Sequence, residues 1–182
     1  MAGPSVLIID SHAIVRFALE TLVLGAPELR LLGSAATLAA GLALIRQRRP
    51  DLVLVDLALS DSRGLDTARA VVEAQRPRRT LVISMLDEML YGEQVLAAGA
   101  DGYIVKDRAP RDLVPAARQV AAGQRWISPQ LNARLLDRLL QQGRAAAPHV
   151  PLTPRELDVL EQLKTGKSTR EIAETLGISS RT

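Results

Sequence analysis

The 182-residue sequence contains no cysteine, and none of its apolar runs is long enough to span a bilayer. Without cysteine, the chain can form neither a disulfide nor a thiolate metal site. Its first residues also lack the basic and then apolar layout of a secretion signal. We therefore expect a cytoplasmic protein that has no membrane partner.

Charge is nearly balanced but unevenly distributed along the chain. Residues 1–122 contain 14 Lys and Arg against 14 Asp and Glu, whereas residues 123–182 contain 9 against 6. The net charge of +3 therefore lies entirely in the C-terminal third. A neutral larger part followed by a mildly basic smaller part is typical of a regulatory domain joined to a segment that faces nucleic acid.

Short apolar segments alternate with amphipathic segments through the first 122 residues. The apolar segments predict buried strands, at Val6–Asp10, Leu29–Ala35, Leu52–Asp56, Leu81–Ser84 and Gly102–Lys106. The amphipathic segments predict helices, at Ala13–Leu24, Leu38–Arg48, Leu65–Gln75, Glu88–Ala98 and Arg111–Ala122. Such alternation requires crossover connections and a parallel sheet covered on both faces. We therefore predict an α/β fold with a flavodoxin-like, doubly wound, five-stranded parallel sheet.

The pattern changes after Gly123. A helix is predicted from Ser128-Pro129 through Leu140, with Ser128 as its cap, followed by a linker to Val150. Two short helices follow, one opened by a capping box from Thr153 and one capped by Ser168. Their inward-facing residues are expected to be Leu157, Leu160, Leu163, Ile172, Ala173 and Leu176. We therefore divide the chain into residues 1–122, 123–150 and 151–182.

Four polar residues follow or end four of the predicted strands, namely Asp10, Asp56, Ser84 and Lys106. Ligands of doubly wound sheets collect at this edge, so the four side chains should meet in one crevice. Two neighbouring carboxylates repel unless a proton or a cation lies between them, and oxygen ligands suit Mg²⁺. A hydroxyl and a lysine could hold the remaining oxygens of a phosphoryl group. The pattern predicts metal-assisted phosphoryl transfer with an aspartate as the nucleophile.

These residues carry a family resemblance that covers residues 5–122. Asp10, PDLVLVD ending at Asp56, LVIS ending at Ser84 and GADGYIVKD containing Lys106 together resemble a two-component receiver domain. The resemblance implies that Asp56 accepts a phosphoryl group from a sensor histidine kinase. It also implies that Mg²⁺ is held by Asp10, Asp56 and the backbone carbonyl of Ala58.

The same resemblance assigns roles to the other residues of the crevice. Ser84 and Lys106 would hold phosphoryl oxygens, and Tyr103 would be the switch aromatic that turns inward with Ser84 on activation. Activation would then favour a homodimer or release of the output unit. The alternatives from the residues alone are a turn-forming Asp10, a strand-end hydroxyl at Ser84, a surface Lys106–Asp107 ion pair and a half-buried Tyr103.

Two positions depart from the receiver pattern. Ser11 stands where the family usually has a second acid, and Leu59-Ser60 replaces a pair whose second residue is often proline. A neutral hydroxyl is a poor ligand for a hard dication, so Mg²⁺ binding should weaken by ~1–2 kcal/mol. This leaves open a receiver that is phosphorylated weakly, or one that acts without phosphate as a dimerisation or interaction module.

The segment LTPRELDVLEQLKTGKSTREIAETLGISSRT resembles the first half of a LuxR-type helix-turn-helix. Together with the receiver pattern and GQRWISP, it resembles the NarL/FixJ class of transcriptional response regulators. The recognition helix would begin near Arg181, so we expect this chain to bind specific DNA poorly, unlike a full-length form. The residues left to contact phosphates would be Lys167, Thr169, Arg170 and Arg181.

Other function classes are less well supported. An aspartyl-phosphate phosphatase typically places an acid two residues after its nucleophile, where this chain has Ala58, so we do not predict an enzyme. A nucleotide-binding protein would need a glycine-rich loop after the first strand, which the sequence lacks. A histidine metal site is not expected, although His12 has a place beside the acidic crevice. Trp126 is expected to anchor the linker, and Gly92 to be an exposed or easily deformed helix position.

Overall fold

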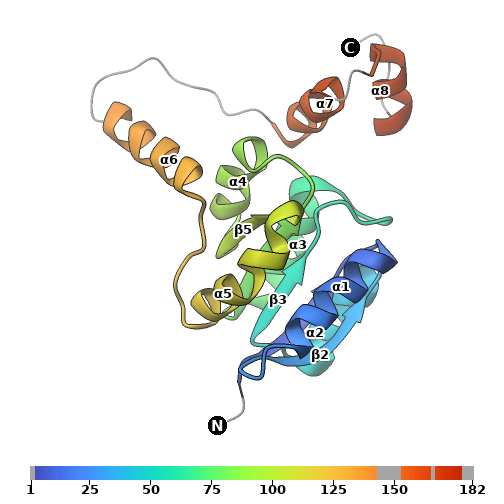
Figure 1. Ribbon diagram of the computed structural model, residues 1–182. Helices are drawn as coiled ribbons and strands as arrows, with labels where there is room; N and C mark the ends of the chain where they lie inside the picture. The colour runs from blue at the N-terminus through green and yellow to red at the C-terminus, as the bar shows by residue number, and fades with distance from the viewer. Residues whose placement is uncertain (1–2, 143–152, 165–166, 178–182) are drawn as a thin grey trace. The chain divides into compact units, whose positions relative to one another are not determined.

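The computed structural model describes residues 3–142, 153–164 and 167–177 (Figure 1). The described residues fall into two compact units that divide between Asp137 and Arg138. The division lies inside a helix, so the predicted boundaries at 122 and 150 remain a prediction.

The first unit is built on a five-stranded sheet in which each ladder is parallel. The strand order is β2-β1-β3-β4-β5, which is the order of the flavodoxin-like, doubly wound class that the sequence predicts. The strands are β1 (Ser5–Ile9), β2 (Arg30–Ala35), β3 (Leu52–Val55), β4 (Arg79–Ser84) and β5 (Gly102–Val105). The order reverses direction between β1 and β3, which places a crevice at the carboxyl ends of these two strands.

Helices lie on both sides of this sheet (Figure 1). They are α1 (Ala13–Leu24), α2 (Leu38–Arg48), α3 (Gly64–Gln75), α4 (Glu88–Ala97) and α5 (Ala109–Ala121). Side chains of β1 alternate between the faces, so Val6 and Ile8 join the core shared with α1 and α5, while Ile9 contacts α2 at Gly41. Fully burying each such aliphatic side chain contributes ~1.5–3 kcal/mol, which holds the strand ends in place.

The observed boundaries differ from the predicted ones by one or two residues, and the difference has a physical cause. β1, β3 and β5 end one residue before Asp10, Asp56 and Lys106; the two acids start loops, and Lys106 starts the short 3-10 helix η1 (Lys106–Arg108). β4 begins at Arg79 rather than Leu81. The backbone N–H of Arg79 donates to the backbone carbonyl of Asp51, just before β3, and so extends the ladder between β3 and β4. The first two residues of this strand, Arg79 and Thr80, are polar, so a prediction from apolar runs begins the strand too late.

The segment after α5 packs against the receiver-like sheet rather than leaving it. Trp126 forms a parallel bridge to Gly102 at the β5 edge, and its carbonyl accepts the Tyr103 N–H at 3.1 Å. Its indole packs against the main core, as predicted for an anchor. Ser128 then caps α6 (Pro129–Gln142), its Oγ accepting the Leu131 N–H at 3.1 Å. The helix runs two residues beyond the predicted end at Leu140.

Leu131 of α6 is completely buried against α4. A Cβ added to Gly92 would lie 2.6 Å from Leu131 Cδ2, so α6 packs where α4 has no side chain. Arg134 adds a hydrogen bond from its Nη1 to the Met89 carbonyl at 2.6 Å. The prediction that Gly92 is exposed is therefore wrong, because α6 covers it.

The second unit contains α7 (Pro154–Lys164) and α8 (Thr169–Leu176), which pack together. Both predicted caps are confirmed: Thr153 and Ser168 each exchange hydrogen bonds with the glutamate three residues later. Leu157, Ile172 and Ala173 are buried as predicted, but Leu163 is 52% exposed. None of the described helices is both long and apolar enough to cross a membrane.

Candidate functional site

Asp10, Asp56 and Lys106 meet at the carboxyl edge of the sheet, as predicted. Lys106 Nζ lies 2.7 Å from Asp10 Oδ2 and 2.6 Å from Asp56 Oδ2, although the three residues follow three different strands. The side chains of the two acids are 1% exposed and that of the lysine 5%. One ammonium between two buried carboxylates leaves a net negative crevice that favours a further cation.

The alternative roles of Asp10 and Lys106 can be judged from these contacts. Asp10 Oδ1 accepts the His12 N–H at 2.8 Å, so one of its oxygens does form the turn into α1. The other oxygen, Oδ2, pairs with the Lys106 ammonium at 2.7 Å. Lys106 pairs with the acids of the crevice, not with Asp107 at the surface.

Ser84 and Tyr103 connect the crevice with α4 and β5. Ser84 Oγ donates to Asp56 Oδ1 at 2.7 Å, and the Tyr103 hydroxyl donates to the Leu86 carbonyl at 2.8 Å. Tyr103 is 2% exposed, so the inward position is the one observed and the half-buried alternative is wrong. Burial raises the pKa of the Tyr103 phenol well above its usual value, against an opposing hydrogen-bond contribution from Ser84. The phenol therefore stays protonated and acts as a donor.

Ser11 lies at the crevice but acts on the backbone rather than as a free ligand. Its Oγ donates to the Ala58 carbonyl at 3.1 Å. This is the carbonyl for which the resemblance implies a metal contact. A hydroxyl that donates to it engages one of its two lone-pair positions.

His12 lies beside the two acids, as the sequence analysis allowed, although that analysis did not expect it to be a metal ligand. Its Nδ1 lies 3.4 Å from Asp10 Oδ1 and 3.8 Å from Asp56 Oδ2. The three side chains each offer one ligand atom, and these atoms lie within 4.8 Å of one another. The only sequence signal for this was the position of His12 two residues beyond Asp10, at the start of a helix.

The donor set of the crevice fits a divalent cation. Asp10 and Asp56 supply two buried carboxylates, and the single Lys106 ammonium between them leaves one negative charge uncompensated. Mg²⁺ binds through one or two carboxylates and completes its shell with water and phosphate oxygens. This acidic pair is typical of a receiver Mg²⁺ site.

Comparison with known proteins agrees with the geometry. The family model for the response regulator receiver domain matches residues 6–118, and that for bacterial regulatory proteins of the luxR family matches residues 150–182. The chain is therefore a two-component response regulator of the NarL/LuxR family. Such a regulator combines a phosphoryl-accepting receiver with a LuxR-type DNA-binding output, so the chain is a signalling protein and not a classical enzyme.

Alignments with individual relatives extend over nearly all of this response regulator. It is 33% identical to the transcriptional regulatory protein MctR of Rhizobium johnstonii, over 97% of this chain and 80% of MctR. It is also 33% identical to the nitrate/nitrite response regulator protein NarL of Escherichia coli, over 98% of this chain and 83% of NarL. A crystal structure of a LuxR-family response regulator from Aurantimonas sp. matches with a TM-score of 0.68 and 27% identity, over 76% of this chain and 99% of that one.

The predicted DNA-contacting residues of the regulator are only partly described. The Arg170 side chain is 87% exposed, with its Nε 3.4 Å from Glu174, and Lys167 Nζ donates to Gln162 at 2.6 Å. Thr169 is the first residue of α8, and its side chain is not described. Arg181 lies outside the described residues. Contact of these four residues with DNA phosphates therefore remains a prediction.

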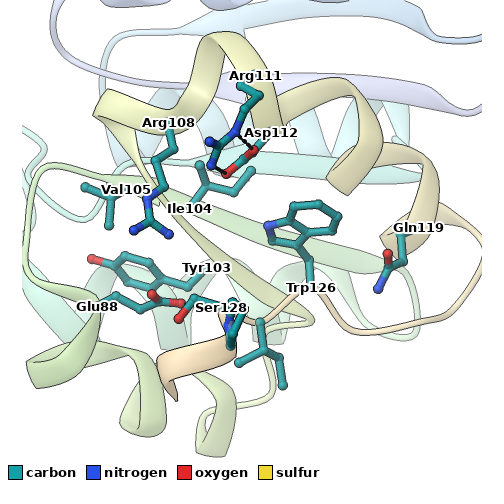
Figure 2. A pocket seen from close by; sticks show the side chains of 12 residues that line it. Glu88, Tyr103, Ile104, Val105, Arg108, Arg111, Asp112, Gln119, Trp126 and Ser128 are labelled. Atoms are coloured by element: carbon teal, nitrogen blue, oxygen red, sulfur yellow. Dashed lines mark hydrogen bonds and ion pairs between the residues drawn. The ribbon is translucent and has the colours of Figure 1, made fainter. Parts of the chain in front are cut away.

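A pocket of about 360 Å³ lies beside the crevice, where the linker meets α4, β5 and α5. Figure 2 shows Glu88, Tyr103 and Ser128 lying together at one end of it, with Trp126 further along. Buried Glu88 accepts the Ser128 N–H at 3.3 Å through its Oε1. Tyr103 and the start of α6 therefore border the same acid, a connection that no sequence motif revealed.

Proposed function

We propose that Asp56 accepts the phosphoryl group of a sensor kinase's phosphohistidine, and that this controls the DNA-binding output. The observation that carries the proposal is the crevice itself. It holds one buried carboxylate, Asp56, in contact with a hydroxyl from Ser84 and an ammonium from Lys106. These are the nucleophile and the oxygen-binding groups that transfer of a phosphoryl group requires.

The reaction is a displacement at phosphorus. An oxygen of Asp56 forms the new bond to phosphorus as the bond to the kinase histidine nitrogen breaks, and the imidazole leaves with that electron pair. Lys106 and Ser84 are placed to donate to the phosphoryl oxygens. Mg²⁺, held by Asp10, Asp56 and the Ala58 carbonyl, would neutralise charge on the transferring group.

The signal would reach the output through the face made by α4, β5 and α5. A phosphoryl group on Asp56 would compete for the Ser84 hydroxyl, which borders the buried Tyr103. Tyr103 and Ser128 share the neighbourhood of Glu88, and α6 starts at Ser128. A shift of α4 would therefore change how α6 is held, and so favour a homodimer or a DNA-binding arrangement of the output.

Mass spectrometry tests the chemical step. The chain incubated with Mg²⁺ and acetyl phosphate should gain one phosphoryl group, and Asp56→Asn should gain none. Asp61→Asn is the matched control, because Asp61 is an exposed acid whose carboxylate accepts backbone N–H groups at α2 instead of entering the crevice. Equal phosphorylation of the Asp56→Asn variant would place the acceptor elsewhere.

A phosphate-independent interaction module is the second candidate, and Ser11 favours it. Its hydroxyl engages the Ala58 carbonyl and adds no negative charge to the crevice. If this candidate is right, the oligomeric state measured by light scattering will be the same with and without acetyl phosphate. Ser11→Asp should tighten Mg²⁺ binding about tenfold, the equivalent of roughly 1–2 kcal/mol. Unchanged affinity would mean that the metal does not lie beside Ser11.

A further inference from the structure

His12 makes the crevice different from a purely oxygen-lined site. The imidazole is 59% exposed, whereas the two carboxylates beneath it are 1% exposed. A cation entering from solvent would therefore meet the imidazole before it reached the acids. In this chain the crevice offers one nitrogen and two carboxylate donors on a single approach path.

The backbone of His12 is held in place at the start of α1. His12 is the N-cap residue of α1 and has an extended conformation, with φ −82° and ψ 108°. Its own N–H donates to Asp10 Oδ1 at 2.8 Å, and its carbonyl accepts the Arg16 N–H at 2.9 Å. Because α1 is anchored by the buried Leu19 and Val23, His12 is fixed at both its backbone groups.

The distances suit direct coordination. Ligand atoms about 2.0–2.2 Å from one metal ion, at tetrahedral or octahedral angles, stand roughly 3.0–3.5 Å apart. His12 Nδ1 is 3.4 Å from Asp10 Oδ1 and 3.8 Å from Asp56 Oδ2. His12 Nδ1 therefore stands near the spacing of co-ligands from both acids, and all three ligand atoms lie within 4.8 Å of one another.

We propose that His12, Asp10 and Asp56 form a binding site for a first-row transition-metal dication, with Zn²⁺ as the representative, in which His12 Nδ1 is a direct ligand. Imidazole nitrogen favours such metals, whereas Mg²⁺ prefers oxygen. Ser11 strengthens the bias, because it supplies no second acid and engages the Ala58 carbonyl. The inference rests on the proposed function, since it uses the same two carboxylates.

Calorimetric titration of the whole chain with Zn²⁺ and with Mg²⁺ tests the proposal. The reference protein carries His149→Gln, which removes the only other histidine. Adding His12→Gln should lower the ratio of Zn²⁺ to Mg²⁺ affinity at least tenfold, because one nitrogen ligand is lost. An unchanged ratio would overturn the proposal.

Pulsed electron paramagnetic resonance of bound Mn²⁺ supplies a readout specific to nitrogen. The reference protein should show nitrogen coupling to Mn²⁺, and His12→Gln should abolish it; coupling that persists in the variant would overturn the proposal. Both proteins should unfold at the same urea concentration, because the His12 side chain is mostly exposed.

Phosphorylation of the unmutated chain by acetyl phosphate with Mg²⁺ separates the two hypotheses. A phosphoryl gain together with an unchanged metal ratio in His12→Gln refutes the His12 site and leaves the function intact. A His12-dependent ratio together with no phosphoryl gain refutes Asp56 as an acceptor and leaves the metal site intact.

Discussion

In the first unit the charged groups of the site are buried, whereas in α7 and α8 they lie at the surface. Lys106 is 5% exposed and pairs with acids 50 and 96 residues away in sequence. Arg170 is 87% exposed and pairs with Glu174, one helical turn away. The receiver site therefore depends on the register of three strands, while the Arg170–Glu174 pair of the second unit depends only on local helix geometry.

The cost in folding stability of breaking an ion pair should also differ between the two units. A buried ion pair is costly to disrupt because the remaining charge has no solvent to replace its partner. An exposed pair on one helix face contributes little. Substitutions in the crevice should therefore change global stability, and equivalent substitutions in α8 should change it little.

The largest effect is expected for Lys106→Met. This change leaves two buried carboxylates without their counter-ion and should lower the free energy of unfolding by about 3 kcal/mol in metal-free buffer, measured by urea denaturation. The variant Asp10→Asn/Lys106→Met removes one charge of each sign and should recover much of the loss. Glu174→Gln, which removes the partner of exposed Arg170, is the control and should cause no measurable change. Equal effects in both units would contradict the comparison.

A smaller effect is expected at the contact between α4 and α6. Gly92→Ala places a methyl group against buried Leu131, and such overpacking costs ~1–3 kcal/mol, partly offset by a gain of about 1 kcal/mol in helix propensity. Hydrogen exchange of the α6 amides before Asp137 should speed up severalfold. Leu131→Ala should speed exchange in the same amides, and the double variant should be non-additive. Unchanged exchange in Gly92→Ala would show that Leu131 moves aside freely.

The smallest effect is expected for Ser168→Ala in the second unit. Losing this cap should cost about 1 kcal/mol of α8 stability, seen as reduced helicity, with no change in the receiver. The Ser168 hydrogen bonds hold the pKa of Glu171 below its usual value. Their contribution is therefore present at neutral pH and lost as pH falls through the folded-state pKa of Glu171. In Ser168→Ala, titration followed by nuclear magnetic resonance should show that pKa rising toward 4.5.

The fold was predictable because its pattern is periodic. Runs such as Val6–Ile9 and Leu52–Val55 are apolar throughout, short and rich in β-branched residues, which favours strands buried on both faces, and amphipathic helical segments alternate with them. Asp10, Asp56, Ser84 and Lys106 could be assigned to one crevice because parallel strands bring their carboxyl ends together. The helix caps at Thr153 and Ser168 were predictable for a different reason, because all the atoms of each cap come from four consecutive residues.

The contacts that could not be predicted from the sequence are side-chain contacts between residues that lie far apart in the chain and on different elements. His12 was expected beside the crevice but not as a metal ligand, because its neighbour Asp56 is 44 residues away in sequence and follows another strand. Gly92 looked exposed because Leu131, which covers it, belongs to a helix whose packing face is not encoded near Gly92. Neither neighbourhood leaves a signal in the spacing of residues along the chain.

By itself, the sequence determined the doubly wound class, the strand-end acids and lysine, and the helix caps, because these follow from hydrogen bonds and burial patterns that repeat locally. Only the tertiary structure decided that Ser11 donates to the Ala58 carbonyl, that His12 stands over the acids and that α6 covers Gly92. These arrangements depend on side-chain distances of 3–4 Å across separate elements, and such distances are set by how the whole core packs.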